Sequence, residues 1–224
     1  MTMRFMDGGG VMGAMLRAHP WTATPLGPSA QWPAQLKTLV GVMLNAPQPM
    51  FVVWGPGQCM LYNDTYAEIL GGHHPALGQP FLEVWYEIRD DVEPIMARAY
   101  AGEPIYMDDI VLMMQRHGHA EETHFSFFYA PVRGDHGEVL GVFCACNEIT
   151  REVLAKREHA AELDRLRDMF ALSPSFVAVL RGPEHRFDLT NAAYLKLIGH
   201  RDVIGLPVRA ALPELEGQGF HELL

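Results

Sequence analysis

The chain has 224 residues, of which 49% are hydrophobic and 20% charged, and its formal net charge is −10. Such a composition is that of a globular protein with a real core, and the length suits one domain of ordinary size plus part of another. The negative charge argues against binding to nucleic acid or to an anionic membrane surface, because both require basic patches.

The sequence contains neither a membrane span nor a secretion signal. Its apolar runs fall short of the ~20 residues that a spanning helix needs, and its first residues, MTMRFMDGGG, lack an apolar core. We therefore expect a cytoplasmic location, where Cys59, Cys144 and Cys146 stay reduced. Cys144 and Cys146 are two residues apart in a strand-like run, so both side chains point to the same face, and we expect buried thiols. We expect no metal site, because further ligands at suitable spacing are missing.

The N-terminal part divides into two segments. Residues 1–13 are rich in Gly and Met and are predicted to be disordered or tag-like. Residues 14–48 are predicted to form a cap region with an amphipathic helix: Pro33 suits its first turn, and apolar residues follow at helical spacing, namely Leu36, Leu39, Val40, Met43 and Leu44.

A ten-residue phrase occurs twice in the chain. YNDTYAEILG, residues 62–71, returns as TNAAYLKLIG, residues 190–199, and matching Gly and Pro residues flank both copies. The spacing between the copies changes by one residue on each side of the phrase, and we expect these extra residues in surface connections. The repeat indicates two domains of one kind in tandem.

The repeated phrase predicts a capped helix that follows a strand. Asn63 precedes apolar residues at helical spacing, and Asn191 does the same in the second copy. An Asn at this position caps a helix by accepting hydrogen bonds from its free N–H groups. Gly71 and Gly199 are expected to end the two helices.

The pattern predicts an α+β fold. Strands are expected over 49–54 and 58–62, followed by short helices, a helix closed by Gly102, and three long strands over 105–114, 122–132 and 138–149. This order gives an antiparallel sheet with helices on one face.

Residues 151–171 contain no Gly or Pro and are predicted to form a connecting helix. Leu163, Leu166 and Phe170 make a short apolar seam at coiled-coil spacing, although Lys156 and His159 occupy the matching earlier positions. The seam favours a dimer contact, and the alternative is a solvated linker helix.

The order of these motifs resembles a PAS domain, the sensory module of bacterial signalling proteins. The resemblance rests on strand, turn and strand followed by Asn-x-x-Tyr-x-x-Ile/Leu-x-Gly, on the Gly-x-Pro at Gly78, and on the final tripeptide Glu148-Ile149-Thr150, where Asp is more common than Glu. The block WTATPLGPSAQWP and the phrase LYNDTYAEILG resemble the front of multi-PAS sensor histidine kinases.

The resemblance implies a PAS fold with a five-stranded sheet at 49–150 and an incomplete second copy at 172–224, which lacks counterparts of the last helix and three strands. We therefore expect a fragment of a longer protein. It would be non-enzymatic, sense a signal, form a homodimer through its cap and linker helices, and relay the signal to an output domain. That output would be the histidine kinase of a two-component system, or alternatively a cyclic-dinucleotide enzyme. His159 lacks the acidic neighbour and the Pro of a phosphoacceptor box.

A small-ligand pocket between the sheet and the helices is predicted, with a well-packed core as the alternative. Its candidate residues are Trp54, Tyr62, Trp85, Met113, His124, Phe125, Phe127 and Tyr129. We expect no cofactor, because LGQPFLEVW lacks the Cys of flavin photosensors and DDVEPIMARAY lacks the His of haem-binding members. His73 and His74 are interpreted as solvent-facing or turn residues rather than as ligands. A haem- or flavin-binding redox, gas or light sensor is the alternative function.

Overall fold

The computed structural model describes residues 4–216 and 218, in two compact units, Met1–Val153 (unit 1) and Leu154–Leu224 (unit 2). The helix α6, Thr150–Leu172, runs from the end of unit 1 into unit 2, as predicted for the connecting segment. Each unit is described by itself below.

Unit 1 begins with short helical elements rather than with a disordered segment. A 3₁₀ turn, η1, covers Arg4–Met6, and α1 covers Gly10–Ala18. The prediction of disorder was therefore wrong for residues 4–13, while residues 1–3 lie outside the described residues. Met6 and Met12 are fully buried, and the Met12 N–H donates to Asp64 Oδ1 over 2.6 Å. The apolar Met side chains anchor a segment whose Gly content alone suggested disorder.

The cap region continues with η2 (Trp21–Ala23), η3 (Ser29–Gln31) and α2 (Ala34–Leu44). Its indoles are buried and hydrogen-bonded: Trp21 Nε1 donates to the Leu16 carbonyl and Trp32 Nε1 to the Gly27 carbonyl. The cap is thus a packed part of unit 1.

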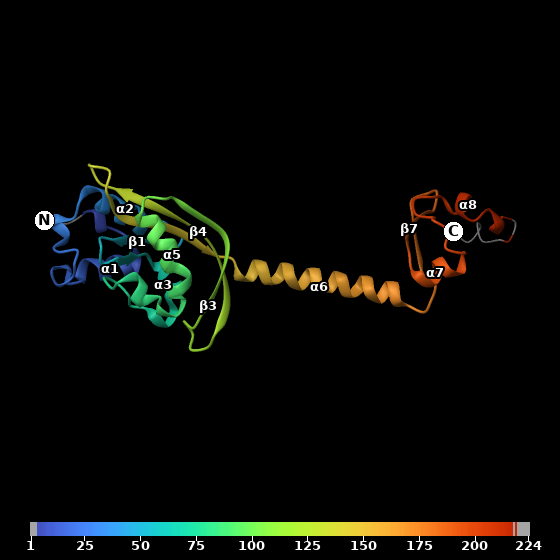
Figure 1. The fold of residues 1–224 in the computed structure, drawn as a ribbon, viewed down its shortest axis with the longest axis horizontal. Helices are drawn as coiled ribbons and strands as arrows, with labels where there is room; N and C mark the ends of the chain where they lie inside the picture. The colour runs from blue at the N-terminus through green and yellow to red at the C-terminus, as the bar shows by residue number, and fades with distance from the viewer. Residues whose placement is uncertain (1–3, 217, 219–224) are drawn as a thin grey trace. The chain divides into compact units, whose positions relative to one another are not determined.

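The core of unit 1 is a five-stranded sheet whose neighbouring strands are all antiparallel, in the order β2-β1-β5-β4-β3 (Figure 1). This confirms the predicted sheet. The strands are β1 (Met50–Trp54), β2 (Cys59–Tyr62), β3 (Ile105–Met114), β4 (Glu121–Arg133) and β5 (Val139–Glu148). Between β2 and β3 the chain forms α3 (Asp64–Leu70), η4 (Gly71–His73), α4 (Phe81–Val84), η5 (Tyr86–Ile88) and α5 (Arg89–Tyr100).

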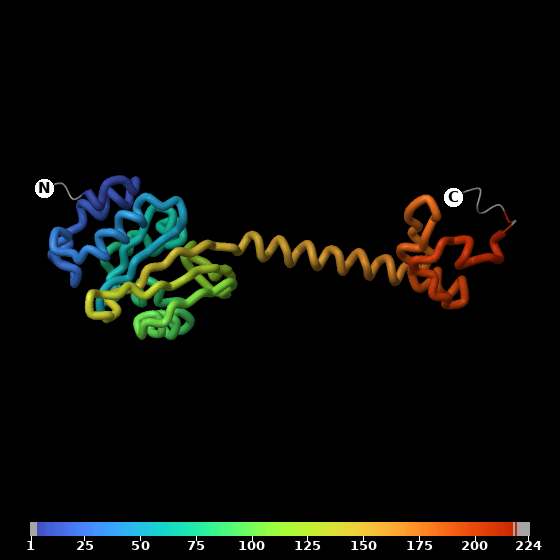
Figure 2. Tube along the Cα trace, turned by 90° about the horizontal axis from the view of Figure 1, so that it is seen from above, coloured from blue at the N-terminus to red at the C-terminus, as the bar shows by residue number. Residues whose placement is uncertain are grey.

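Both faces of the sheet are covered near β1. Phe51 faces the layer of α3 and α4 and contacts the rings of Tyr66 and Phe81. Trp54 faces the other way and lines a hollow with Trp32 and Leu36 of the cap region. Figure 2 shows the sheet between the N-terminal elements and α5. Strand alternation therefore gives β1 two apolar faces, as its continuous apolar sequence requires.

Asn63 ties the cap region, β1 and α3 together. Its Oδ1 accepts from the N–H of Tyr66, which caps α3 as predicted, and from the N–H of Met50. Its Nδ2 lies within 3.2 Å of three backbone carbonyls, those of Met43, Ala46 and Gln48.

Asn191 makes the corresponding contacts in unit 2. Its Oδ1 accepts from the N–H groups of Tyr194 and Val177, and its Nδ2 donates to the carbonyls of Ser173 and Ser175. The cap predicted for the second helix therefore forms in the same way as the first.

The other elements of unit 2 follow the order of the first half of unit 1. They are β6 (Ala178–Arg181), β7 (Arg186–Thr190), α7 (Ala192–Leu197), α8 (Val208–Ala211) and η6 (Pro213–Leu215). The isolated bridge of Cys59 with Pro80 has its counterpart in that of Arg186 with Pro207. One extra residue sits in the β6-β7 pair, whose register shifts between Val179 and Leu180, so this insertion is a strand irregularity and not a loop residue as expected.

Among the helices of the described residues, none combines the length and the apolar character that crossing a membrane requires.

Candidate functional site

A small cavity lies between the sheet and the helices of unit 1, with a volume of about 40 Å³. Residues of β1, α3, α4, η5, α5, β3, β4 and β5 contribute to its wall. Its lining residues are Phe51, Tyr66, Ile69, Phe81, Trp85, Ile88, Val92, Leu112, Met114, Phe125, Phe127, Tyr129, Cys144 and Cys146.

The structure brings four of the eight predicted pocket residues to this cavity, namely Trp85, Phe125, Phe127 and Tyr129. The other four lie elsewhere. Met113 is 54% exposed on the outer face of β3, because its neighbours Leu112 and Met114 take the inward positions.

His124 likewise faces away from the cavity, since Phe125 next to it faces inward. Trp54 lines the hollow beneath the cap region. Tyr62 is buried outside the cavity lining, where its hydroxyl contacts His74 Nδ1 at 2.9 Å and accepts from the N–H of Ala76.

Sequence reasoning missed part of the lining. Phe51, Tyr66 and Phe81 form one ring cluster, although they come from β1, α3 and α4. The helical spacing at Tyr66 and the paired thiols of β5 were visible in the sequence as buried positions. Which of the buried residues would surround a common space depended on the packing of the helices on the sheet.

Burial keeps three ionisable side chains of the lining neutral. Burial raises the pKa of the Tyr66 and Tyr129 phenols and of the Cys144 thiol well above their ordinary values. The Tyr66 hydroxyl accepts a hydrogen bond from Trp85 Nε1 over 3.0 Å. A cavity with this lining suits an uncharged, apolar ligand, and a buried thiol with a raised pKa is a poor nucleophile.

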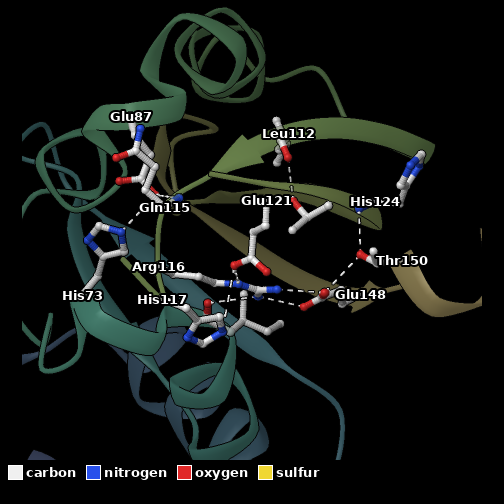
Figure 3. A network of polar contacts seen from close by, with 12 residues as sticks. His73, Glu87, Leu112, Gln115, Arg116, His117, Glu121, His124, Glu148 and Thr150 are labelled. Carbon is white, nitrogen blue, oxygen red and sulfur yellow. Dashed lines mark hydrogen bonds and ion pairs between the residues drawn. The ribbon is translucent and has the colours of Figure 1, made fainter. Parts of the chain in front are cut away.

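A polar cluster lies where β5 ends and α6 begins, and we call it the junction cluster: Arg116, Glu121, Glu148 and Thr150 (Figure 3). The side chain of Arg116 is only 6% exposed. Its Nε donates to Glu121 Oε1 over 2.8 Å, and its two terminal nitrogens contact the two carboxylate oxygens of Glu148 at 2.7 and 2.8 Å. This two-pronged geometry is the strong form of an Arg–carboxylate pair.

Arg116 determines the charge state of Glu148. Burial acts to raise the pKa of this carboxyl, but the hydrogen bonds and charge of Arg116 outweigh burial and hold the pKa below its ordinary value. Glu148 is therefore a carboxylate at neutral pH, and it accepts a further hydrogen bond from the Thr150 hydroxyl over 3.0 Å.

The junction cluster connects the cavity lining with α6. Arg116 Nη1 donates to the carbonyl of Ile69, a lining residue, and Arg116 also holds Glu148. Glu148 in turn contacts Thr150, the first residue of α6. A polar chain thus runs from the cavity wall to the connecting helix.

The linker seam is exposed along α6. Leu163 and Leu166 are 42% and 52% exposed, and Phe170 is half-buried.

In the part of the chain that the structure describes, groups of three or more His, Cys, Asp or Glu side chains that could hold a metal ion are absent.

Comparison with known proteins gives a family match and several similar structures. The family model described as PAS fold matches residues 45–154. The PAS domain of Bordetella pertussis BvgS is 23% identical, with a TM-score of 0.45, and the match covers 59% of this chain and 99% of that one. An RNA-binding light-oxygen-voltage receptor is 22% identical, with a TM-score of 0.41 and coverage of 64% and 42%. A sensory box sensor histidine kinase from Vibrio cholerae is 11% identical, with a TM-score of 0.36 and coverage of 49% and 85%.

Proposed function

Because residues 45–154 form a PAS domain, a sensory rather than a catalytic module, we propose that this chain is the sensory input region of a bacterial two-component signalling protein. In this proposal it acts in the cytoplasm, has no enzymatic activity of its own, and passes its signal through α6 to a histidine kinase. The observation that carries the proposal is the polar chain from the cavity lining through Arg116 and Glu148 to Thr150.

The signal in this proposal is a small apolar ligand that favours one of two arrangements of the cavity wall. A ligand shifts such an equilibrium only through different affinities for the two states. The cavity of about 40 Å³ is close to the ~30 Å³ that one water occupies in the liquid, and far below the ~300 Å³ of an ordinary ligand pocket. A larger ligand would therefore have to displace lining side chains, and that displacement is what the junction cluster would transmit.

Filling the cavity tests the ligand proposal. Leu112→Phe adds bulk to the lining, whereas Val111→Phe adds the same ring to the neighbouring, 47% exposed position and serves as the matched control. Native mass spectrometry of protein exposed to metabolite extracts should show a bound mass in the wild type and in V111F, and lose it in L112F. The absence of any bound mass in the wild type, or its retention in L112F, would contradict the proposal.

A haem- or flavin-binding sensor is the second candidate for this domain. It requires the cavity to widen many-fold, and the absorption spectrum of the purified protein distinguishes it at once. A Soret or flavin band would favour this candidate over the apolar ligand.

We also propose that unit 2 is the first half of a second PAS fold. Six cavity-lining residues of unit 1 have counterparts by sequence position that all line one groove of unit 2, with a volume of about 900 Å³. The counterparts of Phe51, Tyr66, Ile69, Phe81, Trp85 and Ile88 are Ala178, Tyr194, Leu197, Val208, Leu212 and Leu215. In a complete copy, equivalents of α5 and β3 to β5 would cover this groove.

The proposed second pocket would be wider than the first. Three aromatic lining residues of unit 1 are replaced in unit 2 by the smaller Ala178, Val208 and Leu212. A completed second copy is therefore the better candidate for a ligand of metabolite size.

The proposal includes a homodimer formed through the cap and linker helices. Exposed apolar side chains support it on both: Val42 of α2 is 52% exposed, and Leu163 and Leu166 form the seam of α6. Analytical ultracentrifugation should give a dimer mass that falls to the monomer mass in L163D/L166D. The control A161D places an Asp on the opposite side of α6 and should leave the dimer intact. A monomer in the wild type would refute the dimer.

A further inference from the structure

His124 is a buried histidine held between two carboxylates. Its neighbour Phe125 lines the cavity, so His124 points to the other face of β4, yet its side chain is 0% exposed. Its Nδ1 lies 2.7 Å from Asp109 Oδ1 and its Nε2 lies 2.9 Å from Glu122 Oε1. Both carboxylate side chains are 43% exposed and so reach solvent.

An irregularity in β3 accompanies this arrangement. The register of β3 against β4 shifts between Met107 and Ile110, and Asp109 lies inside that shift. Such bulges re-aim side chains and recur beside functional sites. Here the bulge contains the carboxylate that contacts the buried imidazole.

The two contacts are satisfied together by only one protonation state of the ring. A carboxylate can only accept hydrogen bonds, and a neutral imidazole has a single N–H donor. The imidazolium has two, and therefore matches Asp109 of β3 and Glu122 of β4 at once. From α6, the Thr150 hydroxyl accepts a hydrogen bond from the backbone N–H of His124. Loss of the ring proton would leave one carboxylate facing a nitrogen lone pair.

The backbone of His124 is fastened to the start of α6. Its N–H donates to Thr150 Oγ1 over 2.9 Å, and its carbonyl accepts from the N–H of Ile149 over 2.8 Å. Thr150 is also the end of the junction cluster, as Figure 3 shows. A change at the ring therefore acts on the same residue that receives the signal from the cavity.

We propose that His124 is a proton-sensitive latch between β4 and α6, closed when the imidazolium binds Asp109 and Glu122 and loosened when the ring loses its proton. Protonation then becomes a second input to α6, independent of the cavity. The inference rests on the proposed function only in assigning α6 the relay; the latch itself depends on local geometry alone.

The protonation state can be measured directly by NMR titration of the imidazole carbons of the whole chain. The spectra of the wild type should show His124 as an imidazolium while both of its carboxylate partners are ionised. Asp109→Asn should make His124 lose its proton at lower pH, and Asp108→Asn, the exposed neighbour in the same bulge, should not. A neutral His124 ring in the wild type while both carboxylates are ionised, or equal effects of the two variants, would overturn the proposal.

Amide hydrogen exchange measures the latch. After correction for the intrinsic rate, protection of the His124 and Ile149 amides should fall about tenfold or more as the ring deprotonates, as expected for the loss of a charged hydrogen bond. The D109N variant should show the lower protection already at low pH. Unchanged protection across the titration would refute the latch while leaving the ligand proposal intact, since the cavity-filling experiment tests that proposal separately.

Discussion

Replacing Arg116 by Met should destabilise unit 1 strongly. The change keeps an unbranched side chain but removes the Arg116 donors to Glu121, to Glu148 and to the Ile69 carbonyl. Removing one partner of a buried ion pair costs about 3 to 5 kcal/mol, because a charge is left without compensation. The two carboxylates here are 23% and 29% exposed, so water screens them in part. We therefore expect a loss of about 2 to 3 kcal/mol in the free energy of unfolding.

Urea denaturation followed by tryptophan fluorescence is a suitable assay. The four Trp residues of the chain, Trp21, Trp32, Trp54 and Trp85, all lie in unit 1, so the signal reports this unit alone. Arg98→Met is the matched control, because Arg98 pairs with Glu103 at the surface, with side chains 57% and 50% exposed. The control should lose less than about 1 kcal/mol.

A second variant separates charge from packing. R116M/E148Q removes the carboxylate that Arg116 leaves behind, and it should be more stable than R116M. Equal stabilities of R116M and R98M would refute the view that Arg116 compensates buried charge, and so would a double variant no better than R116M.

Three further predictions concern the caps, the pH dependence and one glycine. Asn63→Ala should cost more than the ~1 kcal/mol of an ordinary helix cap, because Asn63 Nδ2 also lies within hydrogen-bonding distance of three carbonyls. Asn191→Ala should leave the tryptophan transition unchanged, because Asn191 lies in unit 2. Because the pKa of Glu148 is lowered in the folded protein, its contribution to stability is complete above the ordinary value of 4.5 and is lost as the pH falls through the lowered value. Urea midpoints measured in acid should show this loss. The E148Q variant should show a smaller loss of stability over the same pH range. Gly71→Ala should destabilise more than Gly118→Ala: both glycines have a positive φ, but only at Gly71 would a Cβ meet a backbone atom, the Arg116 oxygen at 2.9 Å.

The sheet, the capped helices and the connecting helix could be predicted because their signals are local. Alternation along β4 and the spacing after Asn63 each depend on a few neighbouring residues. The inward assignment of Met113 failed because both faces of β3 carry apolar residues, so alternation alone did not identify the core side. The ends of β3 were correct even so.

The contacts between segments that are distant in the chain could not be predicted from the sequence. Arg116 lies in the connection between β3 and β4, and its pairing with Glu148 depends on the order β5-β4-β3 in the sheet. His124 was predicted among the pocket residues. Its carboxylate partner Asp109 is brought to it by an irregularity in β3, which no periodic pattern reveals.

The contacts of Asn63 have a practical consequence for choosing where to cut a recombinant domain. The family match begins at residue 45, yet the Asn63 amide reaches back to the carbonyl of Met43, and Met6, Met12 and Leu16 are fully buried in the same core as the sheet. A truncation at residue 45 would remove the cap region from the outer face of β1 and expose the Trp54 side chain to solvent. Such a shortened protein is expected to aggregate during purification, although it retains every residue by which the family is recognised.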